Sequence, residues 1–266
     1  MLFRLYQHYT GILINRINKR DIHCKEEGDF MKTIGMIGGM SWESTVTYYK
    51  IVNQLIKQEL GGFHSAKVLL YSVDFSEIEE CQVKSEWDKG AELLSDVAVK
   101  LEQAGADFIL ICTNTMHKVA QQIQSRIGIP IIHIADAAAD ELKRHNISKV
   151  ALLGTKYTMT QDFYKQKLES AGITVLIPDE QGIETVNDII FNELCLGNIL
   201  DISRRKYCNI IEILAKQGAQ GVVLGCTEIG MLIHQQDVTL PIFDTTVIHA
   251  TKAARLALKS EQISEK

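Results

Sequence analysis

The fold opens on Met31-Lys-Thr-Ile-Gly-Met-Ile-Gly-Gly39, a short apolar run that ends in two glycines. A strand that runs into a glycine turn is a common first unit of an α/β domain. We therefore expect the fold to begin at Met31. Residues 1–30 have mixed polarity and no uninterrupted apolar segment of the signal-peptide type, so we expect a disordered N-terminal extension there.

Beyond this unit, short apolar runs alternate with longer amphipathic stretches. Runs that are apolar throughout are typical of parallel strands buried on both faces. The stretches 91–104 and 204–217 show helical spacing and are followed by Gly105 and Gly218, as expected at helix ends. This alternation predicts an α/β fold with right-handed crossovers. The expected strands are 68–73, 108–112, 130–134, 150–153, 174–177, 222–225 and 240–243.

Composition narrows the class of protein. The chain has 266 residues, of which 46% are hydrophobic and 23% are charged, values that are ordinary for a folded, water-soluble protein. A formal net charge of −5 without a basic cluster argues against a nucleic-acid partner, and we expect no membrane association. The six cysteines form no Cys-x-x-Cys pair, which favours free thiols in a reducing cytoplasm.

The sequence also repeats itself. Lys149-Val-Ala-Leu-Leu-Gly154 matches Lys32-Thr-Ile-Gly-Met-Ile-Gly38, and the segment from Gly105 to Cys112-Thr matches the segment from Gly218 to Cys226-Thr with one extra residue in the second copy. Two homologous α/β halves related by pseudo-two-fold symmetry are therefore expected. We assign 31–133 plus 240–266 to the first domain, including an amphipathic helix over 246–258 that returns to it, and 134–239 to the second.

Cys112 and Cys226 are the candidate catalytic residues. Each follows a predicted strand, and residues beyond the carboxyl ends of parallel strands meet ligands near the start of the next helix. Two thiols on opposite sides of one small molecule could remove a proton from one face and deliver a proton to the other. A buried structural cysteine is the alternative for either residue alone, but the repeated placement favours a functional pair.

Other side chains near these strand ends are candidate substrate-binding groups. Asn114 and Thr115 could hold a carboxylate or cap the helix, and Asp74 could order an ammonium group or cap the next helix. Glu228 could pair with the ammonium group or tune Cys226, and Lys165 is a candidate for a second carboxylate. The full set is Met40, Ser41, Asp74, Thr113, Asn114, Thr115, Thr155, Thr158, Thr227 and Glu228.

Three segments together carry a family resemblance: Gly38-Gly-Met-Ser-Trp-Glu-Ser-Thr45, Cys112-Thr-Asn-Thr-Met-His117 and Cys226-Thr-Glu-Ile229. From about Met31 onward the chain resembles the cofactor-independent aspartate/glutamate racemases. The resemblance implies two Rossmann-like α/β/α domains with the active site between them. It also implies two-base proton transfer at the α-carbon of an acidic amino acid, neither pyridoxal phosphate nor metal, and a homodimer. Some relatives carry threonine in place of the first motif cysteine and prefer one enantiomer; this sequence is interpreted as keeping both cysteines.

The second motif favours the broader aspartate/glutamate group, because glutamate racemases usually carry His directly after the second Cys-Thr, where this chain has Glu228. Two alternatives stay open. One is a related cysteine-pair enzyme, such as a hydantoin racemase or a maleate-isomerase-like protein, in which one cysteine acts as a nucleophile. The other is a non-catalytic protein that binds a small ligand on the same fold.

Overall fold

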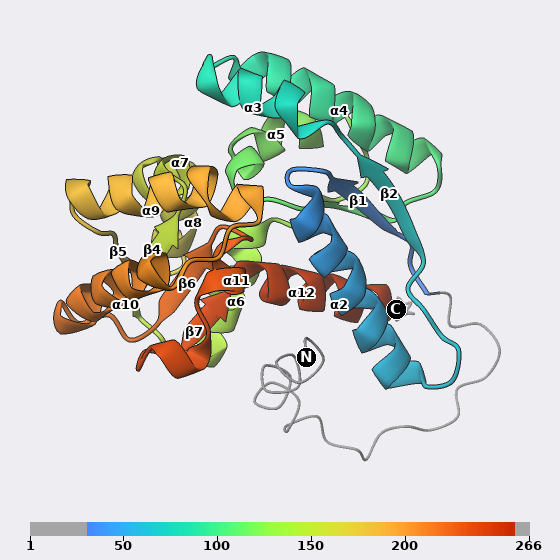
Figure 1. The fold of residues 1–266 in the computed structure, drawn as a ribbon. Helices are drawn as coiled ribbons and strands as arrows, with labels where there is room; N and C mark the ends of the chain where they lie inside the picture. The colour runs from blue at the N-terminus through green and yellow to red at the C-terminus, as the bar shows by residue number, and fades with distance from the viewer. Residues whose placement is uncertain (1–30, 259–266) are drawn as a thin grey trace. The chain divides into compact units, whose positions relative to one another are not determined.

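The computed structural model describes residues 31–258. The expectation for residues 1–30 lies outside the described residues. Residues 31–258 belong to one compact unit that contains two parallel sheets, and Figure 1 shows these sheets side by side. None of the described helices is long and apolar enough to cross a membrane.

The first sheet has the strand order β2-β1-β3, and the second has the order β5-β4-β6-β7. All neighbouring strands are parallel, which confirms the predicted α/β class. The two orders match once β4, β5 and β6 are set against β1, β2 and β3. The strands are β1 (Ile34–Gly38), β2 (Val68–Ser72), β3 (Phe108–Ile111), β4 (Lys149–Gly154), β5 (Thr174–Leu176), β6 (Val222–Gly225) and β7 (Ile242–Asp244).

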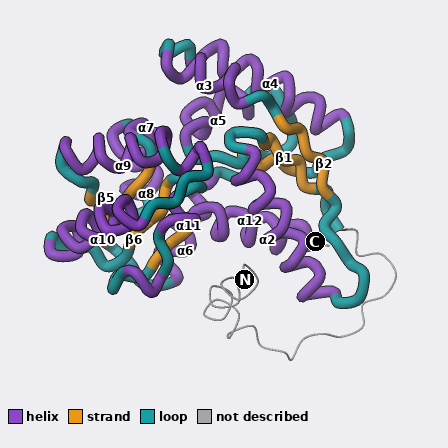
Figure 2. Tube along the Cα trace, viewed as in Figure 1, coloured by secondary structure: helices purple, strands orange, loops and turns teal. Residues whose placement is uncertain are grey.

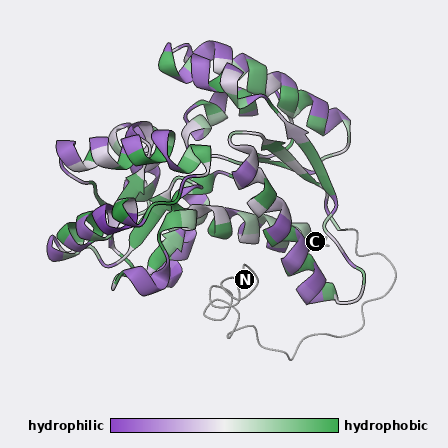
Figure 3. Cartoon of the chain, viewed as in Figure 1, coloured by the Kyte–Doolittle hydropathy of each residue, from purple (hydrophilic) through white to green (hydrophobic). Residues whose placement is uncertain are grey.

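Helices cover both faces of the sheets, as Figure 2 shows, and the apolar strands lie beneath them (Figure 3). Each sheet has two apolar clusters, one on either face. The α-helices are α2 (Trp42–Leu60), α3 (Phe75–Val83), α4 (Trp87–Gln103), α5 (Ala120–Gln124), α6 (Ile134–Arg144), α7 (Lys156–Thr160), α8 (Asp162–Ser170), α9 (Glu180–Asn192), α10 (Asp201–Lys216), α11 (Ile229–Leu232) and α12 (Thr245–Leu258). Three short 3₁₀ turns complete the described elements: η1 (Thr115–Val119), η2 (Leu194–Leu196) and η3 (Gln235–Asp237).

The two glycines expected at helix ends adopt the backbone conformation that requires glycine. Gly105 follows α4 with φ 95°, and Gly218 follows α10 with φ 96°. Both values lie in the left-handed region, where a residue with a Cβ is strained. Each turn leads the chain into a strand that ends at the pocket, β3 in one sheet and β6 in the other.

Two expectations about strands are wrong. The run 130–134 forms only an isolated bridge between Ile131 and Ile109, because α6 already begins at Ile134 and His133 caps it. The segment 240–243 was expected in the first domain, yet β7 pairs with β6 in the second sheet. The helix that follows, α12, packs against α2 beside the first sheet, as expected, and also against α6. The domain boundaries themselves stay a prediction.

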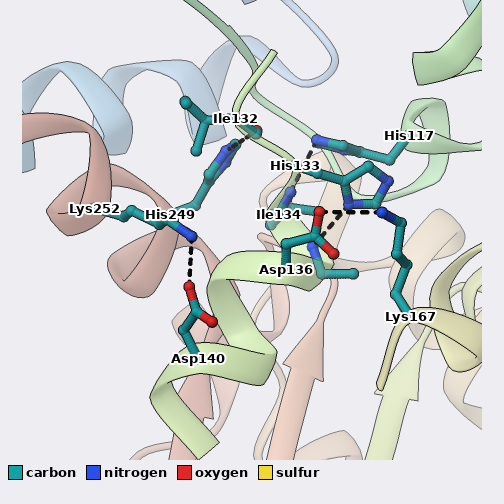
Figure 4. A network of polar contacts seen from close by, with 10 residues as sticks. His117, Ile132, His133, Ile134, Asp136, Asp140, Lys167, His249 and Lys252 are labelled. Atoms are coloured by element: carbon teal, nitrogen blue, oxygen red, sulfur yellow. Dashed lines mark hydrogen bonds and ion pairs between the residues drawn. The ribbon is translucent and has the colours of Figure 1, made fainter. Parts of the chain in front are cut away.

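Two buried histidines, His117 and His249, and the partly buried His133 hold the loop after β3 against α6 and α12 (Figure 4). The Nδ1–H of His117 donates to the carbonyl of Thr113 at 2.8 Å, and its Nε2 accepts from the backbone N–H of Ile134 at 3.2 Å. A backbone N–H can only donate, so this geometry requires the neutral ring. His249 and His133 lie edge-on to His117, with ring centroids 5.7 and 4.6 Å away.

This cluster predicts a loss of stability in mild acid. Burial lowers the pKa of His133 and His249 to about 3, and lowers the pKa of His117 well below its usual range. The unfolded chain takes up these protons below about pH 6.5 and the folded chain does not, so the free energy of unfolding falls as the pH drops from there toward 3. Near pH 5, each histidine lowers the free energy of unfolding by about 1.4 kcal/mol for every pH unit of acidification. The buried Asp244 carboxyl, with a pKa raised to about 6, offsets part of the loss.

His133→Asn tests this expectation by urea unfolding between pH 5 and 7. Asparagine preserves a side-chain cap for α6, where the His133 ring now accepts from the backbone N–H of Ala135. Near pH 5, the slope of the unfolding free energy against pH should therefore decrease by about 1.4 kcal/mol per pH unit, and the unfolding free energy at pH 7 should change little. An unchanged slope would show that His133 does not titrate on unfolding.

Candidate active site

A pocket lies where the carboxyl ends of β3, β4 and β6 face α9 and the loop after β1. It brings together most of the candidates chosen from the sequence, although they come from segments far apart in the chain. The predicted residues that line it are Met40, Ser41, Thr113, Asn114, Thr115, Thr155, Cys226, Thr227 and Glu228.

The centre of the pocket is the buried carboxylate of Glu228. Its Oε1 accepts from the Ser41 hydroxyl at 2.7 Å, and its Oε2 accepts from the Thr227 hydroxyl at 2.7 Å and the Cys226 thiol at 3.0 Å. Ser41 also caps α2 beside the first sheet, whereas the other two donors follow β6 in the second. Glu228 therefore ties the two sheets together and is the hydrogen-bond acceptor for the Cys226 thiol.

The Cys226 thiol is a poor acid in this resting arrangement. Burial raises its pKa well above the usual value, and the negative charge of Glu228 raises the pKa further. A thiolate at Cys226 therefore requires a change in local charge, such as transfer of the thiol proton to Glu228 or the arrival of a cation. The ammonium group of an amino acid is one such cation.

Cys112 is not part of the pocket, which corrects the expected pairing of two thiols. Its side chain is fully buried with those of Phe108 and Leu110 on the face of the first sheet that packs against α2 and α12. Alternate residues of a strand point to the same face, so the position of Cys112 follows from the positions of these neighbours. Burial alone raises the pKa of the Cys112 thiol beyond the range of a useful base.

Sheet register identifies the residue that stands opposite Cys226 instead. Ile37 of β1 pairs with Ile111, and Leu153 of β4, the equivalent of Ile37, pairs with Leu224. Counting two residues past Ile111 reaches Thr113, and counting two past Leu224 reaches Cys226. Thr113 is thus the structural counterpart of Cys226, and both line the pocket.

The counterpart of Cys112 is Gly225, one residue earlier in each copy. A Cβ at Gly225 would lie 3.0 Å from Leu152 and 3.1 Å from the carbonyl oxygen of Leu153, so this half has little space for a side chain there. The two halves therefore carry different residues, Cys112 and Gly225, at equivalent positions. The two Cys-Thr pairs that look alike in the sequence lie one position apart in the structure.

A row of hydroxyl groups forms the polar wall of the pocket. The hydroxyl of Thr155 lies 3.2 Å from those of both Thr115 and Thr158. Thr155 and Thr115 line the pocket, and Thr158 is fully buried behind them, so it is not a lining residue. The amide nitrogen of Asn114 donates to Thr245 at 3.0 Å, whereas its buried oxygen has no partner among the described residues.

Asp74 has the capping role that was its alternative interpretation. Its carboxylate accepts from the backbone N–H of Ser76 at 3.0 Å, where α3 begins, and it does not line the pocket. The next residue, Phe75, lines the pocket instead. The turn after β2 therefore reaches the site through an apolar ring.

Sequence reasoning missed several lining residues: Phe75, Gln82, Ile190, Phe191, Cys195 and Gly225. Most of them come from α3, α9 and η2, which carry no recognisable motif. Cys195 has no counterpart in the repeat, and only tertiary packing places it beside Cys226. Among the described residues, no group of three or more His, Cys, Asp or Glu side chains is arranged to hold a metal ion.

The chain is similar to proteins of one known family. Residues 37–253 match the family model for Asp/Glu/hydantoin racemases. The chain is 25% identical to the broad-specificity amino-acid racemase RacX of Bacillus subtilis over 232 residues, which are 85% of this chain and all of RacX.

Two solved structures are also similar. A Yersinia pestis protein with a provisional Asp/Glu racemase assignment has 54% sequence identity and a TM-score of 0.82, over 86% of this chain and 100% of its own. An aspartate racemase homologue from Pyrococcus horikoshii has 37% identity and a TM-score of 0.76, with the same coverage. The chain therefore belongs to the Asp/Glu/hydantoin racemase family, whose members are cofactor-independent, and is an amino-acid racemase.

Proposed function

We propose that this racemase inverts its substrate with one thiol and one hydroxyl, Cys226 on one face of the α-carbon and Thr113 on the other. The observation that carries the proposal is the equivalence of these two residues in the register of the two sheets. Both line one pocket, and each follows the carboxyl end of a strand, β3 for Thr113 and β6 for Cys226.

On the Cys226 face, the proton can move along an existing hydrogen bond. The thiol donates to Glu228 at 3.0 Å, so transfer of that proton gives a thiolate and a neutral carboxyl. The thiolate then removes the α-hydrogen of a substrate whose hydrogen points toward it. A substrate ammonium group nearby would stabilise both the thiolate and the carbanion.

On the Thr113 face, the hydroxyl delivers a proton to the carbanion and regains one from water. An alcohol is too weak an acid to rest as an alkoxide near neutral pH, so Thr113 serves better as a proton donor than as a base. The two enantiomers are equally stable in solution, so kcat/KM must be the same in both directions. The difference between the two groups therefore appears in kcat and KM separately, and in hydrogen exchange.

The finer parts of the assignment rest on the family resemblance. It implies aspartate or glutamate as substrate, action without cofactor or metal, and a cytoplasmic homodimer. A nucleophilic isomerase on this site would leave a covalent adduct at Cys226, and a ligand-binding protein would bind without turnover, so mass spectrometry and turnover assays separate these alternatives.

The first prediction compares serine variants of the two cysteines, assayed by chiral chromatography without cofactor. Cys226→Ser should reduce racemisation by about 100-fold or more, because a general base typically contributes about 10²–10⁴-fold. Cys112→Ser should retain activity within about tenfold and lose mainly stability, since it places a hydroxyl in an apolar cluster. Equal loss in both variants, with both folded, would restore a two-thiol mechanism.

The second prediction concerns Thr113 and is measured in deuterated water. Thr113→Val removes the hydroxyl and keeps the shape, so inversion should fall about 100-fold. Exchange of the α-hydrogen with retention should persist for the enantiomer whose hydrogen faces Cys226. Thr113→Cys should support inversion at or above the wild-type rate. Parallel loss of exchange and inversion in Thr113→Val would assign Thr113 a purely structural role.

A further inference from the structure

The pocket lining carries negative charge and no positive charge among the described residues. Glu228 is the only charged side chain that lines it, and no lysine, arginine or histidine among residues 31–258 does so. A substrate with a second carboxylate would therefore bring that group beside a buried anion, without a cation to pair with it. Burying an unpaired carboxylate is strongly unfavourable.

Three lysines that lie close in sequence to lining residues are engaged elsewhere. Lys84 pairs with Glu80, Lys118 lies over the ring of Trp87, 3.7 Å from its centroid, and Lys156 pairs with Glu184. Lys165, the candidate chosen from the sequence for a side-chain carboxylate, lies 3.8 Å from Asp162 and does not line the pocket. The basic group that an acidic substrate would need is thus missing from the described lining.

The polar and apolar parts of the lining come from different elements. Most of the hydroxyl and amide groups follow the strands, and the buried oxygen of Asn114, which has no partner among residues 31–258, is an acceptor suited to an ammonium group. The remaining wall comes from the loop after β1, from α3 and from the end of α9 with η2, and its apolar side chains are Met40, Phe75, Ile190, Phe191 and Cys195. The one amide on this wall, Gln82 of α3, is uncharged and donates to the sulfur of Met116 at 3.2 Å. An α-carbon between Thr113 and Cys226, with its charged groups on the polar wall, leaves this apolar wall for the side chain.

We propose that the substrate of this site is an amino acid with an uncharged, largely apolar side chain, and that aspartate and glutamate are disfavoured. The proposal rests on the racemase function proposed above and specifies its substrate class. Selectivity comes from the apolar wall and from the charge of Glu228.

The thiol of Cys195 is a second sign of negative potential at this wall. Burial and the nearby charges of Glu228 and Glu43 together raise the pKa of Cys195 to about 12. Burial and the same two negative charges also disfavour a substrate carboxylate placed beside this thiol. An uncharged side chain does not meet this penalty and gains from leaving water.

The test compares L-methionine with L-glutamate as probes. Wild-type racemisation, followed by chiral chromatography, should give a kcat/KM at least about tenfold higher for methionine. Dissociation constants measured by calorimetry on Cys226→Ser, which binds with little turnover, should rank the probes in the same order. Equal or better values for glutamate in both measurements would overturn the proposal.

A matched pair of variants tests the role of charge. Phe191 lies in the last turn of α9, where the helix dipole favours a cation, and it is only partly buried. Phe191→Lys should raise the glutamate-to-methionine ratio of kcat/KM about tenfold or more, whereas Phe191→Met should leave the ratio near the wild-type value. An equal shift in both variants would show that shape, and not charge, sets the selectivity.

The two proposals fail in different ways. If neither probe nor any other amino acid is racemised, the proposed function is wrong, and the calorimetric order still decides the selectivity of the pocket. If glutamate is racemised faster and bound more tightly than methionine, the function stands and the substrate class is wrong. If Phe191→Lys does not fold, the wild-type ratio and the two dissociation constants decide the question.

Discussion

The site depends on one buried carboxylate. Glu228 accepts hydrogen bonds from a serine that caps α2 beside the first sheet and from a threonine and a cysteine that follow β6 in the second. A buried anion without donors would destabilise the fold, so these three side chains must converge for the chain to pack there. The same convergence places a thiol next to a proton acceptor. The hydrogen bonds that stabilise the buried Glu228 carboxylate therefore also set the position of the Cys226 thiol for proton transfer.

The hydroxyl wall and the histidine cluster extend this constraint outward. Asn114 bonds to Thr245, whose hydroxyl in turn donates to the carbonyl of Leu224, so the loop after β3 is connected to the end of β6. On its other side, His117 connects the same loop to the start of α6. Thr113 lies between these two anchors. Its position relative to Cys226 is thus held by contacts on both sides.

Most of the fold could be predicted from the sequence, because buried parallel strands and glycine-ended helices have strong local signals. The site was predicted less well, and Cys112 shows the reason. Gly105 and Gly218 lie 113 residues apart, and holding that offset through the strand would have aligned Thr113 with Cys226. Aligning the two Cys-Thr pairs instead requires one extra residue in the second copy. A one-residue shift along a strand exchanges the two faces of that strand. The apolar wall could not be predicted locally, since Phe75 and Phe191 meet only through tertiary packing.

The position of the two reacting groups also bears on how such a protein can change over evolutionary time. Thr113 and Cys226 follow the ends of β3 and β6, whereas Cys112 and Gly225 each stand one residue earlier, where the side chain of Cys112 is packed in the core and Gly225 has little space for a side chain. Substitution of Thr113 or Cys226 alters the acidity available on one side of the substrate and leaves the scaffold intact. After a gene duplication, the reacting group of one half can therefore change while that of the other half stays the same. A symmetric ancestor with two identical reacting groups needs few substitutions to become an enzyme with two different ones.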